Sequence, residues 1–211
     1  MENQNVMKTG TTTVGIMCKD GIVLAADKRA TAGNFITDKK AQKIYKINDN
    51  MALTTAGVVS DVQLLVKLIK AELSLKEIRT ERKPNVKESV NLLAGLVYSN
   101  IRKMSMIPGI SHFLFAGSDY GGLHLYDIYA DGSLTKHDSY VSSGSDSVMA
   151  YGVLETLYKS DMKIDEGIKL AVKCINAALQ RDSATGSGID VVTVTKEGIK
   201  TVLEKEIKTD L

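Results

Sequence analysis

The chain has 211 residues, of which 44% are hydrophobic and 25% charged, and its formal net charge is +2 at pH 7. This length and composition are those of one globular domain, and the small net charge points to no nucleic-acid or membrane partner. No stretch approaches the roughly 18 apolar residues of a membrane span, and residues 1–10 lack the apolar run of a secretory signal, so we expect a cytoplasmic protein.

Nine stretches of apolar, β-branched or alternating residues, bounded by turn signals, predict β-strands. They cover residues 11–18, 21–27, 42–47, 51–57, 112–117, 123–129, 133–141, 189–195 and 198–205. The first two are joined at Lys19-Asp20-Gly21, where Asp-Gly is expected to supply the positive φ angles of a tight hairpin turn. Residues 133–141 are expected to complete an antiparallel meander with the two strands that precede them.

Four segments carry apolar residues at helical spacing and predict helices over residues 62–79, 86–101, 145–157 and 165–179. Ser60-Asp61 offers an N-cap for the first helix and Asn85 for the second, and the serines that precede the third can cap it. The strands are joined by hairpin turns rather than by βαβ crossovers. This order predicts an α+β protein with antiparallel sheets inside and helices on their outer faces.

The two cysteines, Cys18 and Cys174, lie in apolar contexts far apart in the sequence, which predicts buried free thiols rather than a disulfide. No CxxC motif or histidine cluster suggests a metal, and we expect no metal or organic cofactor. Residues 1–10 form a short polar leader that fits either a frayed terminus or a removable prosegment.

The candidate nucleophile is Thr11, in the segment KTGTTTVGI of residues 8–16. A threonine hydroxyl needs a neighbouring base, because its proton is held far above neutral pH. Cleavage between Gly10 and Thr11 would give Thr11 a free α-amine with a pKa of roughly 7.7 to 8, which suits a proton shuttle at neutral pH. Taken without the rest of the chain, the same residues are also typical of an ordinary β-strand.

Six blocks of the sequence carry a resemblance to a known family. They are TGTTTVGI at 9–16, AADKRAT at 25–31, KKAQKIYKI at 39–47, TTAGVVSD at 54–61, SSGSDSVMAYGVLE at 142–155 and RDSATGSGIDVVTV at 181–194. In this order they resemble the β subunits of the 20S proteasome, of the single-type archaeal form, within the N-terminal-nucleophile hydrolases. The resemblance covers nearly the whole chain and implies a four-layer αββα sandwich.

The resemblance also implies a catalytic apparatus for a threonine endopeptidase. Thr11 would be the nucleophile, Asp27 and Lys43 its charged partners, and the Gly57 backbone N–H the oxyanion donor. The residues implied to surround and orient the Thr11 amine are Ser145, Asp182 and Thr185. Thr185 stands where serine is commoner, and Asp146 follows Ser145 where glycine is usual.

Further expectations concern processing and specificity. Residues 1–10 would be a propeptide that the chain removes by autocatalytic cleavage at Gly10-Thr11, leaving residues 11–211 as the catalytic domain of an enzyme made as a zymogen. The first specificity pocket is implied to consist of Ala30, Thr31, Ala41, Thr55, Val59 and Gln63. Small and mostly neutral walls predict cleavage after apolar residues.

By the same resemblance, the partners would be proteasome α subunits, other β subunits in heptameric rings, an ATPase unfoldase and unfolded polypeptide substrates. Two alternatives stay open: a non-catalytic structural ring subunit of the same assembly, and a subunit of the bacterial two-component threonine protease. A penicillin-recognising hydrolase is excluded, because KTG at 8–10 lies in the leader rather than on a strand that follows the nucleophile.

Overall fold

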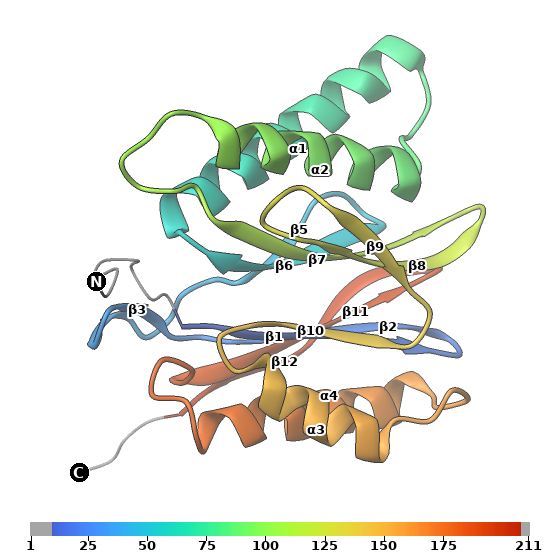
Figure 1. Cartoon of the computed structure of the whole chain (residues 1–211). Helices are drawn as coiled ribbons and strands as arrows, with labels where there is room; N and C mark the ends of the chain where they lie inside the picture. The colour runs from blue at the N-terminus through green and yellow to red at the C-terminus, as the bar shows by residue number, and fades with distance from the viewer. Residues whose placement is uncertain (1–9, 208–211) are drawn as a thin grey trace.

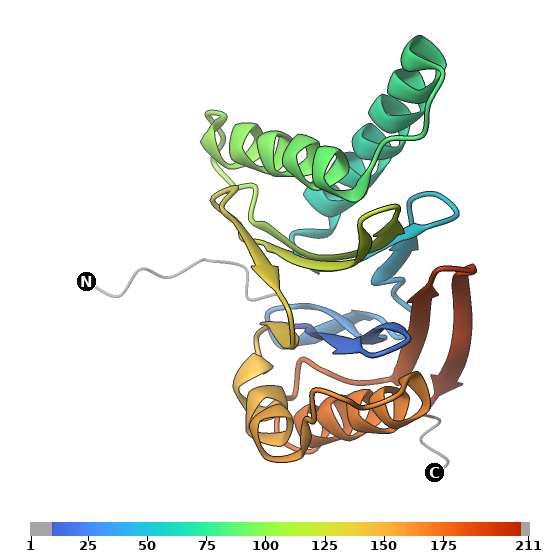
Figure 2. The same ribbon diagram turned by 90° about the vertical axis from the view of Figure 1, so that its right-hand side faces the viewer.

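The structure is a computed structural model that describes residues 10–207; of the predicted propeptide, residues 1–9 lie outside the described residues. Two five-stranded antiparallel sheets lie face to face, and a pair of helices covers the outer side of each (Figures 1 and 2). The α+β class and the four-layer αββα arrangement are therefore confirmed.

One sheet has the strand order β10 (Tyr140–Gly144), β1 (Thr12–Cys18), β2 (Gly21–Asp27), β11 (Gly188–Thr195) and β12 (Gly198–Glu206). Its outer face is covered by α3 (Ser147–Leu157) and α4 (Ile164–Leu179). The other sheet has the order β5 (Ile44–Lys46), β6 (Met51–Gly57), β7 (Ser111–Asp119), β8 (Gly122–Ile128) and β9 (Leu134–His137). It carries α1 (Val59–Thr80) and α2 (Val86–Arg102).

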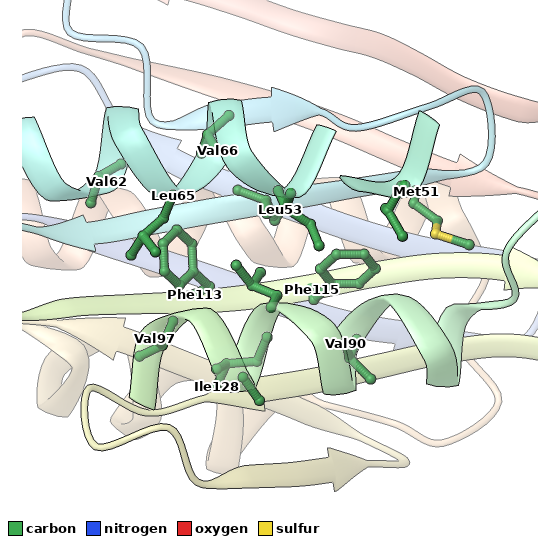
Figure 3. Close-up of a cluster of buried hydrophobic side chains, with 14 of the residues drawn as sticks. Met51, Leu53, Val62, Leu65, Val66, Val90, Val97, Phe113, Phe115 and Ile128 are labelled. Atoms are coloured by element: carbon green, nitrogen blue, oxygen red, sulfur yellow. The ribbon is translucent and has the colours of Figure 1, made fainter. Parts of the chain in front are cut away.

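The hydrophobic core has three main layers. Between the helices α1 and α2 and their sheet, Phe113 and Phe115 of β7 pack among buried Leu and Val side chains (Figure 3). A second layer, which includes Leu24 and Leu114, fills the space between the two sheets. A third layer lies between the helices α3 and α4 and the sheet that contains β1. Each fully buried side chain of this size contributes about 1.5 to 3 kcal/mol, so these layers hold the sheets in fixed relative positions.

The β1–β2 hairpin forms where it was predicted, with Cys18 opposite Gly21, but the expected positive φ angles are absent from its turn. Gly21 is required for a different reason, since a Cβ there would lie 2.8 Å from the Val194 carbonyl oxygen of β11. The Asp20 carboxylate accepts the Ile164 N–H at the start of α4, at 2.8 Å. The Asp-Gly pair thus serves packing against two later elements.

The predicted strand over residues 133–141 is divided in the structure. β9 completes the meander beside β8, whereas β10 crosses to the other sheet and pairs with β1. The alternation of polar and apolar residues is the same in both parts, so it could not show the change of sheet. The hairpin of β3 (Ala30–Ala32) and β4 (Phe35–Asp38) was not predicted, because its strands are short and mostly exposed.

The predicted helix caps have different outcomes. Asn85 caps α2 as expected, because its side chain accepts the Glu88 N–H at 2.8 Å and Glu88 accepts the Asn85 N–H in return. The cap predicted at Ser60-Asp61 is wrong, since α1 already begins at Val59 and has no side-chain cap. The serine cap expected for α3 is also wrong; Asp146 occupies that position without a capping hydrogen bond. None of the helices in residues 10–207 is long and apolar enough to cross a membrane.

Candidate active site

The site forms where three strands of one sheet end beside the other sheet. Thr11 immediately precedes β1, and it is 5% exposed. β2 ends at Asp27 and β10 ends at Gly144, both next to the start of β1, because all three strands pair antiparallel. Lys43 approaches from the facing sheet, just before β5. Residues distant in the sequence therefore meet at one end of the sandwich.

Asp27 is fully buried and accepts four hydrogen bonds. Lys43 Nζ lies 2.8 Å from Oδ1, and the Thr12 N–H donates to the same oxygen at 3.0 Å. The backbone N–H groups of Arg29 and Gly186 donate to Oδ2, each at 3.0 Å. A buried carboxylate is costly unless its oxygens are satisfied, and these donors also fix its direction. Asp27 is thus a rigid, charged support for Lys43.

Lys43 and the Thr11 hydroxyl converge on one carbonyl group. Thr11 Oγ1 donates to the Gly10 carbonyl oxygen at 2.6 Å, and Lys43 Nζ donates to the same oxygen at 3.3 Å. Burial lowers the pKa of the Lys43 ammonium, and the nearby Asp27 and Asp182 carboxylates oppose that shift. Lys43 therefore places a positive charge next to the hydroxyl, while its proton is held less firmly than that of an exposed lysine.

A second hydrogen-bonded group surrounds the Thr11 nitrogen. The Thr11 N–H donates to Ser145 Oγ at 3.2 Å, and Ser145 Oγ donates to Asp182 Oδ2 at 2.8 Å. Thr185 Oγ1 donates to that same oxygen at 2.7 Å and contacts the Thr12 hydroxyl at 2.8 Å. Partial burial raises the pKa of Asp182, but the hydrogen bonds that its carboxylate accepts outweigh burial and hold the pKa below its ordinary value. Thr185 thus supplies the hydroxyl that the commoner serine would supply.

Asp146, the second departure from the family pattern, lies beside this group. Burial is the larger cause that raises the pKa of Asp146, and the negative charge of Asp182 raises it further. Its Oδ2 is buried and accepts no hydrogen bond from residues 10–207. The surroundings of Asp146 therefore make a negative charge at this position less favourable than on a solvated carboxylate.

Thr11, Lys43 and Gly57 line a cleft of about 300 Å³. Five of the six predicted pocket residues line it as well: Ala30, Ala41, Thr55, Val59 and Gln63. Thr31 does not; its hydroxyl instead accepts the Gly10 N–H at 3.1 Å. Gly57 has a φ of +126°, and a Cβ there would lie 2.2 Å from the Ile110 carbonyl oxygen, so only glycine fits at this wall of the cleft.

Sequence reasoning missed several members of the site. Thr37 and Asp38 line the cleft from the unpredicted strand β4, and Tyr45 lines it from β5. The alternation within FITD at 35–38 was the available signal for β4. Arg29 and Gly186 act on Asp27 through their backbone N–H groups, for which side-chain identity provides no signal.

Away from the site, Cys18 and Cys174 are buried free thiols, as predicted. Burial raises the pKa of both to about 12, so neither thiol is a ready nucleophile. Within the described part of the chain, no three His, Cys, Asp or Glu side chains are grouped so that they could hold a metal ion.

Comparison with known proteins shows one family. The family model "Proteasome subunit" matches residues 7–194. The chain is similar to "Proteasome subunit beta" of Archaeoglobus profundus, at 45% identity over 98% of this chain and 94% of that protein. It is also similar to the proteins of the same description from Ferroglobus placidus (46% identity, 93% of this chain and 95% of that protein) and Archaeoglobus fulgidus (47%, 89% and 86%).

Proposed function

The chain belongs to the proteasome subunit family and is a β subunit of the 20S proteasome, and from this premise we propose that it is a catalytic threonine endopeptidase with Thr11 as its nucleophile. The observation that carries the proposal is the convergence of the Thr11 hydroxyl and the Lys43 ammonium on the carbonyl oxygen of Gly10. A nucleophile and a cation directed at one carbonyl are what attack on a peptide bond requires.

In the mature subunit the free α-amine of Thr11 acts as the base. It takes the proton from Thr11 Oγ1 as the oxygen attacks the substrate carbonyl, and later gives that proton to the departing amine. Lys43 stabilises the developing alkoxide, and Ser145 holds the amine in place through the bond it makes to the Thr11 nitrogen. Water then hydrolyses the ester on Thr11 and completes the turnover.

The negative charge of the tetrahedral intermediate needs a donor of its own. We assign this role to the Gly57 N–H, because Gly57 lines the same cleft as Thr11 and the absence of a Cβ allows the substrate backbone to approach closely. A preorganised donor of this kind typically contributes about 2.7 to 4 kcal/mol to the barrier reduction.

The subunit also removes its own leader in this proposal. Thr11 Oγ1 attacks the Gly10 carbonyl carbon, the acyl group passes from nitrogen to oxygen, and water hydrolyses the resulting ester to a Gly10 carboxylate and a free Thr11 amine. Before cleavage the Thr11 nitrogen is an amide without useful basicity, so a water held by Lys43 or Ser145 serves as the base. No subunit can then cut other chains before it has cut itself.

Within the assembly, the chain associates with proteasome α subunits and other β subunits, as its family implies. The proposal adds heptameric β rings between α rings, an ATPase that supplies unfolded polypeptides, and a cytoplasmic location. The non-catalytic alternative is disfavoured, because Gly10, Thr11, Asp27, Lys43 and Gly57 are all retained. The relatives, which are archaeal proteasome subunits matched over most of their length, disfavour the bacterial two-component protease.

The proposal is tested with one variant in which cleavage at Gly10-Thr11 is blocked and one form in which this cleavage is not needed. A Cβ at Gly10 would lie 1.8 Å from the Ala184 Cβ and 2.7 Å from the Ala184 backbone, so Gly10→Val cannot keep the geometry of the scissile bond. We expect Gly10→Val to retain its leader by intact mass and to be inactive in the assembled particle. The matched control lacks residues 1–10 and exposes Thr11 from a cleavable fusion, and it should be active once assembled.

Two results would contradict this account. Peptide hydrolysis by the uncut Gly10→Val chain at the rate of the processed subunit would show that the free α-amine is not the base. An assembled wild-type particle that keeps residues 1–10 and hydrolyses no peptide would identify the chain as a structural ring subunit.

The cleft also leads to a prediction about specificity. Most of its walls are small or apolar, and Asp38 is exposed at its edge, where its carboxylate accepts the Lys40 N–H at 2.8 Å. Lys43 is already paired with Asp27, so a charged side chain that enters the interior of the cleft would be desolvated without a free partner. We expect cleavage after Leu, Phe or Tyr to exceed cleavage after Lys or Asp by about 10- to 100-fold in kcat/KM.

Sequencing the products of a denatured protein would measure this preference. Asp38→Asn is the matched control, because loss of an exposed charge should leave the ratio almost unchanged. Products that end mainly in basic or acidic residues would contradict the assignment of the pocket.

A further inference from the structure

A second cavity, of about 400 Å³, adjoins the Thr11 cleft. Both are lined by Ala56 and Gly57 at the end of β6. The Thr11 cleft extends to the β5 side of that strand, where Lys43 and Tyr45 lie, whereas the second cavity extends to the β7 side, toward His112, Asp127 and Tyr129. The two cavities therefore flank the glycine assigned as the oxyanion donor.

The second cavity also borders the nitrogen side of Thr11. Ser142, Ser143 and Gly144 of β10 line it, and Gly144 lies opposite Thr12 in the sheet. The next residue, Ser145, bonds the Thr11 nitrogen. In the proposed reaction the departing amine takes its proton from this nitrogen, so the part of the substrate after the scissile bond leaves on this side. This assignment rests on the proposed function.

A hydrogen-bonded chain of three side chains forms one wall of the cavity. His112 of β7 contacts Asp127 Oδ1 of β8 through Nε2, and Ser143 Oγ of β10 lies 2.8 Å from His112 Nδ1. These residues come from three strands of the two sheets, and Ser143 is 3% exposed. The hydrogen-bonded chain joins the two sheets and fixes the position of the Asp127 carboxylate.

The other Asp127 oxygen is available to a ligand. Oδ2 accepts no hydrogen bond from residues 10–207 and is not closed off from solvent. No lysine or arginine lines the cavity among the described residues. The Tyr129 ring packs on the His112 ring with a centroid distance of 4.5 Å, and Tyr151 also lines the cavity, so its walls carry aromatic surface beside the carboxylate.

We propose that this cavity binds the side chain of the residue that follows the scissile bond, and that Asp127 selects a cationic side chain there. A lysine or arginine places an aliphatic stem against Tyr129 and Tyr151 and its charged end at Asp127 Oδ2. An acidic side chain meets a like charge at the same point and is disfavoured. The preference concerns the residue after the cut and is independent of the apolar preference before it.

The test uses particles reconstituted with α subunits and internally quenched peptides that are identical except at the residue after a fixed leucine. That residue is lysine, norleucine, which has an aliphatic chain without the charge, or glutamate. We expect kcat/KM for the lysine peptide to exceed that for the norleucine peptide by about tenfold, and the glutamate peptide to be cleaved most slowly. Asp127→Asn should bring the lysine-to-norleucine ratio close to one.

Asp138→Asn is the control, since Asp138 is exposed and does not line the cavity, and it should keep the wild-type ratio. Equal kcat/KM for lysine and norleucine in the wild type overturns the proposal even if Asp127→Asn fails to assemble. An Asp127→Asn particle that assembles and keeps the lysine preference overturns it as well. Equal cleavage of all three peptides contradicts only the proposal for this cavity and leaves the proposed threonine endopeptidase activity unaffected. Failure to cleave any of the peptides contradicts both proposals.

Discussion

Replacing Thr11 with alanine should abolish peptide hydrolysis and leave the particle assembled. The hydroxyl, which donates to the Gly10 carbonyl at 2.6 Å, is the only group that the change removes from the reaction. Loss of a nucleophile of this type lowers kcat by a factor on the order of 10⁴ to 10⁶. The same variant cannot attack the bond before residue 11, so its intact mass should include residues 1–10.

The measurement is turnover of a fluorogenic peptide by purified particles, together with mapping of an electrophilic peptide probe by mass spectrometry. The probe should modify Thr11 in the wild type and no residue in Thr11→Ala. Thr13→Val is the matched control, because it removes a buried hydroxyl two residues further along β1 whose own hydrogen bond, to Ser143 O, is long at 3.4 Å. Substantial turnover by pure Thr11→Ala particles would rule out Thr11 as the nucleophile.

Replacing Lys43 should be nearly as damaging. Lys43→Ala removes the charge beside the Thr11 hydroxyl, and we expect kcat to fall by about 10² to 10⁴. Lys43→Arg should not restore it, because a planar guanidinium cannot take the place of a compact ammonium between Asp27 Oδ1 and the Gly10 carbonyl oxygen. Wild-type rates in Lys43→Arg would show that only the charge matters.

The Lys43→Ala result needs a control for stability. The change leaves Asp27 buried without its cation, which typically costs about 3 to 5 kcal/mol. Lys28→Ala is the matched variant, because Lys28 is also buried and pairs with Asp190 and Glu204, each at 3.0 Å, outside the Thr11 site. Thermal unfolding of both variants should show a loss of stability, while only Lys43→Ala should lose activity in assembled particles.

Several features followed from local sequence because local chemistry decides them. The first hairpin was located by turn residues between two β-branched stretches. The N-cap at Asn85 was predicted because its hydrogen bond, from the Glu88 N–H, spans only three residues. Helix spacing placed α4 to within one residue. The roles of Thr11, Asp27 and Lys43 came from family resemblance, since a lone lysine on a strand is more often a solvated surface residue.

The sequence by itself therefore determined the four helices and most of the strands, since periodicity and turn chemistry act over a few residues. Only the tertiary structure decided that β10 leaves the meander to pair with β1, which brings Ser145 to the Thr11 nitrogen. It also decided that Asp27 is held by backbone donors and that Asp127 faces a cavity. These contacts join residues up to 159 positions apart, and packing of the two sheets selects them among many pairings that local patterns leave equivalent.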